Sequence, residues 1–418
     1  MNETIIFVYA DWIKDKPVLI GRLYVDKMRG KETFSFEFDK DWFMQTESKF
    51  LLDPDLSLYP GRQYLKSEKQ IFGLFSDSCP DRWGRKLMQR REASYARKQE
   101  RKPRALTESD YLLGVYDDSR MGALRFSLTK DGPFLSTDEE LATPPWVSLR
   151  KLENATRSFE NSSVKDEEKW INMLIAPGSS LGGARPKASV LAPDGSLWIA
   201  KFPSKHDDVN TGAWEIVTHD LAAMCSLNIP DAKIEKFSKY GSTFLTKRFD
   251  REKGKRIHFA SAMTMIGKTD GEDANYLELA SAIRSYGVSP KKDLKELWKR
   301  IVFNMAVSNT DDHLRNHGFL LKSNGWLLSP GYDINPSIYG HELSLAVNEF
   351  DADIDFDLAL ETAEYYDISM AEGKQYISET KEIVNKNWRV IAAKYGISRS
   401  EIEFMEPAFS AVALAKGN

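Results

Sequence analysis

The sequence predicts a mixed α+β protein, with a strand-rich lobe followed by a mainly helical lobe. Up to Phe249, short apolar runs alternate with turn residues, a pattern typical of strands and hairpins. Beyond Phe249, apolar residues recur at the spacing of amphipathic helices. The 418 residues are enough for two to three domains or lobes of ~100–200 residues each. No repeat at a solenoid period is visible, which excludes a repeat protein.

Each element follows from local patterns taken in chain order. Apolar runs bounded by turn residues predict strands at 5–10, 18–25, 33–38, 188–191, 197–202, 319–321 and 326–328, and a hairpin over 232–248. The turn Pro193-Asp194-Gly195 supports the hairpin between 188 and 202. Periodic apolar residues predict helices over 78–101, 212–226, 276–286, 293–307, 357–366, 370–387 and 400–415. The proline-containing, Ser/Thr/Asp-rich stretch 133–151 is the predicted linker.

Composition narrows the class of protein. Hydrophobic residues make up 42% and charged residues 29%, with a formal net charge of −4, so a disordered chain and a net-basic nucleic-acid binder are disfavoured. No apolar run approaches the roughly 18 residues of a membrane span, and we expect no membrane partner. Two cysteines, Cys79 and Cys225, are too few for a disulfide framework or a four-cysteine zinc site. The N-terminus lacks the features of a signal peptide, so the expected compartment is the cytoplasm.

Charge is distributed unevenly along the chain. The segment 82–104 holds ten lysines and arginines against two glutamates, a local net charge of +8. It is either a surface for phosphates or an acidic partner, or simply a solvated helix face. The segment 342–382 has a local net charge of −10. Its alternating aspartates do not form a calcium loop, because Phe356 and Thr362 occupy the required Gly and Glu positions, so a solvated loop is expected.

The segment 309–316 (NTDDHLRN) carries the chemistry that phosphoryl transfer requires. It follows an apolar helix and precedes a hairpin, after which Asp333 appears. One aspartate can accept a hydroxyl proton, and an Asn with a second Asp can hold magnesium against phosphates. Asp311 is the candidate base, and Asn316 and Asp333 are the candidate metal ligands. The alternative is an ordinary polar turn between helix and strand.

Upstream segments supply the other parts of a kinase site. The small-residue loop 178–187 (GSSLGGARPK) could bring backbone N–H groups to phosphates, although a flexible linker has a similar composition. Lys201 lies on an otherwise apolar strand face, and Glu215 on the next helix is its candidate partner. An edge-strand lysine is the alternative. His313 and His317 have a zinc-like spacing, but no further ligands accompany them.

Together these segments resemble the HipA-type serine/threonine kinases, the toxin half of bacterial type II toxin–antitoxin pairs. The likeness rests on 180–187 (SLGGARPK), 199–203 (IAKFP), 247–251 (KRFDR), 309–316 (NTDDHLRN) and 332–333 (YD), in the family's order. The stretches 72–81 and 122–124 resemble the family's accessory region. The resemblance implies a two-lobed protein-kinase-like fold. It divides the chain into an accessory subdomain at 1–145, the kinase N-lobe core at 146–249 and a helical C-lobe at 250–418.

The resemblance also implies roles for single residues. Asp311 would be the catalytic base, Asn316 and Asp333 would bind Mg²⁺, and Glu215 would complete a structural ion pair. The 246–249 stretch would be the hinge that reads adenine. The implied ATP contacts are Ser180, Leu181, Gly182, Gly183, Ala184, Lys187, Lys201, Lys247, Phe249 and His313. Ser180, or its neighbour Ser179, would be autophosphorylated, which expels the loop and switches the kinase off.

The implied partners are a protein substrate and a helix-turn-helix antitoxin. Family targets include aminoacyl-tRNA synthetases, and DNA would be reached through the antitoxin, with the basic segment 82–104 as a possible contact. Two alternatives remain open. The chain could be a non-catalytic partner of a DNA-binding regulator, or a small-molecule kinase on the same scaffold.

Overall fold

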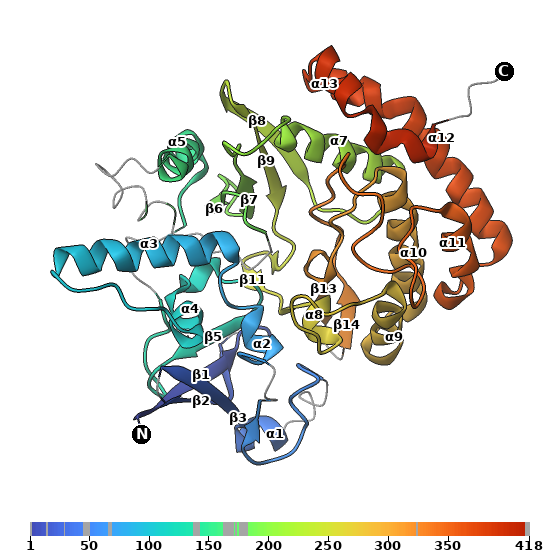
Figure 1. Cartoon of the computed structure of the whole chain (residues 1–418). Helices are drawn as coiled ribbons and strands as arrows, with labels where there is room; N and C mark the ends of the chain where they lie inside the picture. The colour runs from blue at the N-terminus through green and yellow to red at the C-terminus, as the bar shows by residue number, and fades with distance from the viewer. Residues whose placement is uncertain are drawn as a thin grey trace, which may run out of the picture. The chain divides into compact units, whose positions relative to one another are not determined.

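The structure, a computed structural model, divides into two compact units. The first comprises residues 1–205, 247–269 and 320–325, and the second comprises 206–246, 270–319 and 326–418. Residues 2–13, 16–28, 30–44, 51–65, 69–136, 143–161, 171, 174, 183–322 and 325–413 are described. Figure 1 labels the elements along the chain. These units do not coincide with the three regions 1–145, 146–249 and 250–418, which remain a prediction.

The first unit begins with an antiparallel sheet of order β4-β3-β2-β1-β5. Its strands are β1 (Asn2–Ala10), β2 (Val18–Met28), β3 (Lys31–Phe38), β4 (Gln63–Tyr64) and β5 (Leu124–Ser127). The first three confirm the predicted strands and extend beyond them. Alternation explains their formation, because Ile6, Val8 and Ala10 are fully buried at every second position.

Helices of the first unit are mostly short. They are α1 (Lys40–Met44), α2 (Gly73–Ser76), α3 (Arg82–Lys98), α4 (Glu108–Gly114), α5 (Leu149–Glu160) and α8 (Ala262–Met265), with 3₁₀ turns at Asp117–Ser119 and Trp146–Ser148. The helix expected over 78–101 starts later, because Asp81 is its N-cap and accepts a hydrogen bond from Gly84 N. The last residues of the predicted linker, 149–151, belong to α5.

The predicted hairpin around Asp194 is confirmed. Strands β6 (Lys187–Leu191) and β7 (Leu197–Lys201) pair antiparallel, with Lys187 opposite Lys201. The turn works because Asp194 accepts hydrogen bonds from the Ser196 backbone and hydroxyl, while Gly195 takes a φ of +79°. Three short strands follow later in the unit, at Arg251–Glu252 (β10), Lys255–Arg256 (β11) and Phe259–Ser261 (β12).

The second unit is mainly helical. Its helices are α7 (Thr211–Met224), α9 (Tyr276–Tyr286), α10 (Pro290–Ala306), α11 (Phe356–Glu361), α12 (Met370–Lys394) and α13 (Arg399–Phe404), with 3₁₀ segments η6 (Leu314–Asn316), η7 (Ala363–Tyr366) and η8 (Glu406–Val412). The hairpin predicted over 232–248 is β8 (Ala232–Ser238) and β9 (Gly241–Lys247), which ends at the unit boundary. Strands β13 (Gly318–Lys322) and β14 (Gly325–Leu328) fall partly in each unit.

Aromatic packing organises the core of this helical unit. Trp388 of α12 stacks on Phe409 of η8 with ring centroids 4.3 Å apart, and Trp214 of α7 lies 6.0 Å from the same ring. All three side chains are buried. The continuous helix predicted over 400–415 is wrong in detail, because the segment splits before η8, where Pro407 has no N–H to continue an α-helix. Among the described residues, no helix is both long and apolar enough to span a bilayer.

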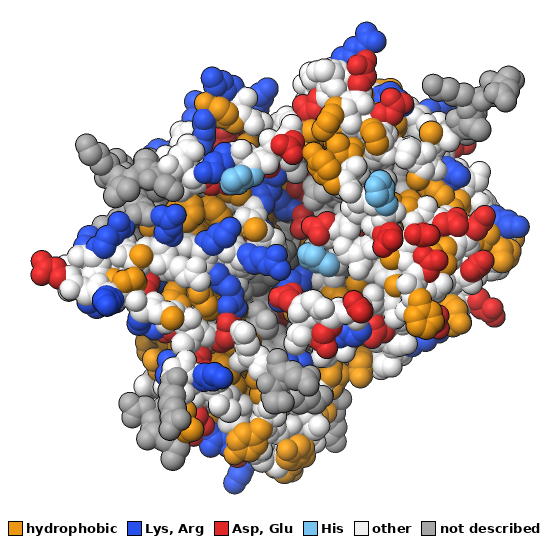
Figure 2. Space-filling model, viewed as in Figure 1, with side chains coloured by type: hydrophobic (Ala, Val, Ile, Leu, Met, Phe, Trp, Pro, Cys, Tyr) orange, Lys and Arg blue, Asp and Glu red, His pale blue; other side chains and the backbone are white. Residues whose placement is uncertain are grey.

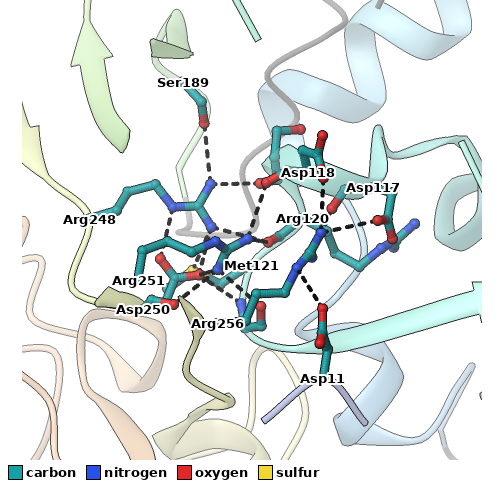
Figure 3. A network of polar contacts seen from close by, with 12 residues as sticks. Asp11, Asp117, Asp118, Arg120, Met121, Ser189, Arg248, Asp250, Arg251 and Arg256 are labelled. Atoms are coloured by element: carbon teal, nitrogen blue, oxygen red, sulfur yellow. Dashed lines mark hydrogen bonds and ion pairs between the residues drawn. The ribbon is translucent and has the colours of Figure 1, made fainter. Parts of the chain in front are cut away.

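A buried arginine network ties two distant segments of the first unit together (Figure 3). Asp250, which is fully buried, accepts hydrogen bonds from Arg248, Arg251 and Gly122 N. The guanidinium groups of Arg248 and Arg251 also donate to the carbonyl oxygen of Arg120, at 3.1 and 2.8 Å. The segment after β9 is therefore held to the loop before β5.

Candidate active site

The loop 309–316 is shaped by a turn at the end of α10. Ser308 has a φ of +47°, in the left-handed region, which bends the chain sharply away from the helix axis. The backbone N–H of Asn309 then donates to the Asn304 carbonyl at 2.9 Å, and the side chain of Asn309 donates to Asn304 Oδ1 at 3.1 Å. The start of the loop is thereby anchored to the helix, and it leads directly into η6.

Asp311 and Asn316 are joined within this loop. The Asp311 side chain is exposed, whereas its backbone carbonyl accepts hydrogen bonds from His313 N at 3.0 Å and Asn316 Nδ2 at 2.9 Å. The Asn316 side chain is buried, and its Oδ1 atom has no hydrogen-bond donor among the described residues. A buried amide oxygen without a protein donor can accept a hydrogen bond from water or bind a metal ion.

Asp333 belongs to a segment that is tied to the same loop. Asn335 N donates to Asn309 Oδ1 at 3.3 Å, and Ser337 N donates to the Ser308 carbonyl at 3.0 Å. Asp333 itself has a φ of +59°, and its carboxylate accepts a hydrogen bond from Asn335 Nδ2 at 3.1 Å. The structure thus brings the segments of both predicted metal ligands together within the second unit.

These residues fit a magnesium ion. Mg²⁺ prefers hard oxygen ligands, keeps several waters and takes only one or two protein carboxylates. Asn316 offers an unused buried oxygen and Asp333 offers a carboxylate. Among the described residues, no group of three or more His, Cys, Asp or Glu side chains could hold a metal. That result disfavours a zinc site at His313 and His317 but leaves the Asn–Asp pair as it stands.

A buried polar cluster beneath the loop was not foreseen from the sequence. Asp312 Oδ2 accepts hydrogen bonds from Asn304 Nδ2 at 2.6 Å and from the Tyr276 hydroxyl, and His317 Nε2 lies 2.8 Å from it. Burial alone would raise the pKa of Asp312, but the His317 ring and these hydrogen bonds outweigh it and hold that pKa below its usual value. The zinc-like spacing of the histidines is therefore explained, since His317 pairs with Asp312.

The sequence feature that could have indicated this cluster is a second aspartate, Asp312, directly after Asp311. Neighbouring side chains on such a tight loop point in different directions, so one carboxylate is exposed while the other, Asp312, is buried. His313 lies half-buried in the same loop. Glu215, on α7, is buried in the second unit, whereas Lys201 belongs to the first. Their pairing remains a prediction.

Only some of the predicted phosphate-binding residues of the first unit are described, and two of them, Lys187 and Lys201, belong to the β6–β7 hairpin. Ser179, Ser180, Leu181 and Gly182 lie outside the described residues. Gly183 has a φ of +90°, Ala184 is exposed, and Lys187 and Lys201 are buried. Lys187 Nζ lies 3.0 Å from Asp81 Oδ2, a partner that the sequence did not indicate.

The predicted hinge 246–249 begins with the last two residues of β9 and continues beyond the strand. Arg248 N donates to the Leu197 carbonyl at 2.9 Å, which fixes the stretch against β7. Phe249 packs in a small apolar cluster, with its ring 6.2 Å from that of Phe259. Lys247 is half-buried at the end of the strand.

Comparisons with known proteins can now be set beside this geometry. A family model described as "HipA-like C-terminal domain" matches residues 179–388. The serine/threonine-protein kinase toxin HipA of Shewanella oneidensis is 23% identical over 379 residues, which cover 80% of this chain and 78% of that protein. Y4dM of Sinorhizobium fredii, whose name classes it provisionally as a kinase, is 25% identical over 218 residues, or 48% of this chain. The matched region covers 49% of Y4dM, so this chain spans about half the length of that relative.

A solved structure shows the fold. It contains Shewanella oneidensis MR-1 HipA and HipB with their operator DNA, and it matches with a TM-score of 0.64 at 16% sequence identity. The match covers 97% of this chain and 95% of that one. The predicted mixed α+β fold of this type is thereby confirmed.

Proposed function

The chain belongs to the HipA-like family, and from that premise we propose that it is an ATP- and magnesium-dependent serine/threonine protein kinase acting as a growth-inhibiting toxin. One observation carries the proposal. The loop 309–316 presents an exposed carboxylate, Asp311, and holds beside it a buried Asn316 whose Oδ1 atom has no donor among the described residues. A phosphoryl-transfer site needs an exposed carboxylate that can accept the proton of a substrate hydroxyl, and an oxygen atom that can bind the metal ion.

Each remaining residue has a role in this proposal. Asp311 accepts the proton of the attacking hydroxyl, and Asn316 and Asp333 hold magnesium, which when bound neutralises charge on the phosphates. Lys201, supported by Glu215, contacts the phosphates of ATP, and the glycine-rich segment with Lys247, Phe249 and His313 completes the nucleotide site. The chain is then organised as an accessory subdomain, a kinase N-lobe core and a helical C-lobe.

Regulation and targets form the finer part of the proposal. The substrate is a translation protein such as an aminoacyl-tRNA synthetase, which places the chain in the cytoplasm. Autophosphorylation at Ser180 or Ser179 switches the kinase off. A phosphate adds a charge of about −1.5 to −2 and competes with ATP for the same anion-binding backbone.

The partner is a helix-turn-helix antitoxin that binds operator DNA. The structure of HipA and HipB with operator DNA supports this choice, because one of its chains has the same fold as this chain. Figure 2 shows Lys and Arg side chains gathered where α3 runs, which suits a DNA backbone. Within the segment, however, Arg85, Arg101 and Arg104 are paired with Glu108, Glu92 and Asp110. Glu92 is already counted in the net charge of +8, but Glu108 and Asp110 lie outside the segment and balance two more of its positive charges.

The test is incubation of the purified chain with magnesium and labelled ATP, followed by phosphosite mapping. Asp311→Asn should reduce labelling by about 10²–10⁴-fold, the contribution of a positioned base. The matched control is Asp351→Asn, which alters another exposed loop aspartate and should leave labelling unchanged. Undiminished labelling of Asp311→Asn, or no labelling of a stock that mass measurement shows to be unphosphorylated, would overturn the proposal.

The two other functions predict different outcomes of the same assay. A non-catalytic partner of a regulator would bind operator DNA with its antitoxin and transfer no phosphate. A small-molecule kinase would consume ATP and leave the label in a small product rather than in protein. Asp311 and Asn316 favour the protein kinase over the first alternative, because a binding module does not require this pair.

A further inference from the structure

A buried arginine of α10 binds the segment that leads to Asp333, within the second unit. Arg300 is only 3% exposed, and its Nη2 atom donates to the Ser329 carbonyl at 2.7 Å. Its Nε atom donates to Glu296 Oε1 at 3.0 Å, one turn earlier on the same helix. A buried guanidinium group needs such partners, because a buried charge without them is costly. The helix therefore supplies a charge-assisted donor to the backbone four residues before Asp333.

The same glutamate closes a ring of hydrogen bonds around this segment. Glu296 Oε1 also accepts from Asn228 N at 3.0 Å, and the Asn228 carbonyl accepts from Gly331 N at 2.7 Å. Arg300 and Glu296 thereby hold the backbone at two points, the Ser329 carbonyl directly and the Gly331 N–H through Asn228.

The backbone between these two points is also paired. Ser329 N donates to the Gly318 carbonyl at 2.8 Å, and the Ser329 hydroxyl donates to the Pro330 carbonyl at 3.0 Å. Pro330 itself has no N–H to satisfy. Each backbone polar group from Ser329 N to Gly331 N therefore has a partner, and the segment cannot shift without breaking hydrogen bonds.

Asp333 needs this support on both sides. Its φ of +59° lies in the left-handed region, which is strained for a residue with a Cβ atom and persists only where the surroundings hold it. After Asp333, the Ile334 carbonyl accepts from the Thr218 hydroxyl at 2.6 Å, and Asn335 N donates to Asn309 Oδ1 at 3.3 Å. The ring at Arg300 supplies the anchor before it.

From these contacts we propose that Arg300 is a positioning residue for metal binding. With Glu296 it fixes the segment 329–331 and so keeps Asp333 in the conformation that binds magnesium. Arg300 acts through the backbone and not as a ligand. This inference rests on the kinase function and on the metal role of Asp333 proposed above. Without Arg300 the segment spends only part of its time in the binding conformation, and the apparent Kd of the metal rises by the inverse of that fraction.

Two substitutions of the arginine grade the effect. Arg300→Met keeps a long buried side chain but removes the charge and all N–H donors. Arg300→Lys keeps the charge but lacks the planar fork that reaches both Ser329 and Glu296. The loss of metal binding should therefore be larger for methionine than for lysine.

Two controls in the same unit separate positioning from other effects. Arg284→Met makes the same substitution at an exposed arginine of α9, which also donates to a backbone carbonyl, that of Tyr365 at 2.9 Å. Leu358→Ala removes a buried side chain of α11 and destabilises the unit by leaving a cavity. Neither control should change metal binding by the folded chain.

The experiment measures the binding of Mn²⁺, a paramagnetic substitute for Mg²⁺, by electron paramagnetic resonance in the presence of a non-hydrolysable ATP analogue. Arg300→Met should raise the Mn²⁺ Kd about tenfold or more. Arg300→Lys should raise it about threefold or more. The apparent Mg²⁺ constant for autophosphorylation should rise in parallel, while kcat at saturating Mg²⁺ changes by less than about threefold, because saturating metal overcomes a loss of binding.

The outcomes separate this role from the kinase function itself. A wild-type chain that binds no Mn²⁺ with the nucleotide, or Asp333→Asn with wild-type affinity, overturns the proposed metal site and this inference together. Wild-type affinity in folded Arg300→Met overturns the positioning role alone, as does an equal loss in Leu358→Ala, which would trace the effect to stability. If Arg300→Met does not fold, Arg300→Lys decides, and wild-type affinity in that variant overturns the role.

Discussion

Asp250→Asn tests whether the buried arginine network stabilises the first unit. The Asp250 side chain is fully buried, and its oxygens accept from Arg248 Nη2 at 2.6 Å, Arg251 Nη1 at 2.6 Å and Gly122 N at 2.8 Å. Asparagine keeps the shape of the side chain but removes the charge and places an N–H group toward the guanidinium donors. The variant therefore leaves buried cations without their carboxylate.

The size of the effect follows from the pKa of this carboxyl group. Burial would raise it, but Arg248 and Arg251 hold the pKa of Asp250 at about 2. Against about 3.9 in the unfolded chain, this difference corresponds to about 2.6 kcal/mol at pH 7. Because the folded pKa is the lower one, this stabilisation is present above about pH 4 and is lost as the pH falls toward 2. Removing one partner of a buried pair raises the expected cost to about 3–5 kcal/mol.

Thermal unfolding of wild type, Asp250→Asn and Asp118→Asn at pH 7 measures the difference. Asp118 is the matched control, since it contacts Arg256 in the same network but its side chain is 69% exposed, and it should cost less than about 1 kcal/mol. For a unit of this size, about 2–4 °C corresponds to 1 kcal/mol, so Asp250→Asn should lower Tm by about 6–20 °C. Equal Tm values for the two variants would refute the reasoning, as would an undiminished difference at pH 3.

Three further predictions concern other buried groups. Burial lowers the pKa of His258 to about 3, so the free energy of unfolding falls by about 1.4 kcal/mol per pH unit as the pH drops below about 6.5. In denaturant titrations, His258→Phe should reduce the loss of stability between pH 7 and 5 by about 2 kcal/mol. An unchanged dependence of stability on pH would contradict this. Burial raises the pKa of Cys79 and Cys225 to about 12, so a thiol reagent should modify both only in denaturant, and rapid reaction of the folded chain would disprove the burial. Tyr276→Phe removes a hydrogen-bond donor to the Asp312 carboxylate and should lower the free energy of unfolding by about 1.5–3 kcal/mol, measured as a lower Tm of the second unit. An unchanged Tm would show that this hydrogen bond does not stabilise the fold.

Periodic features of the fold were predictable from the sequence. The alternation of Ile6, Val8 and Ala10 predicts one face of a strand, and Asp194-Gly195 predicts a turn. Both elements are set by residues close together in the sequence, so local patterns are enough to predict them. The end of the chain was less predictable, since Pro407 interrupts an otherwise helical apolar pattern.

The candidate site was predictable only in part. The spacing of Asp311 and Asn316 within one loop was enough to expect them together, and Asn316 Nδ2 does contact the Asp311 carbonyl. Pairs between distant segments were not predictable, because no periodicity links Lys187 to Asp81. The resemblance implies an ATP contact for Lys187, which stays a prediction; the neighbour that the structure shows, Asp81, comes from the start of α3.

The arginine network has a consequence for how such chains can evolve. Arg248, Arg251 and Arg256 donate to backbone carbonyls of Ser119, Gly122 and Asp117, at 2.6, 3.0 and 2.9 Å. These acceptors belong to the peptide chain itself, so no side-chain substitution within 117–122 can remove them. A loop with a different backbone path at 117–122 would take these carbonyl oxygens away from all three guanidinium groups. We therefore expect that the loop and its arginines can be exchanged between related chains only together.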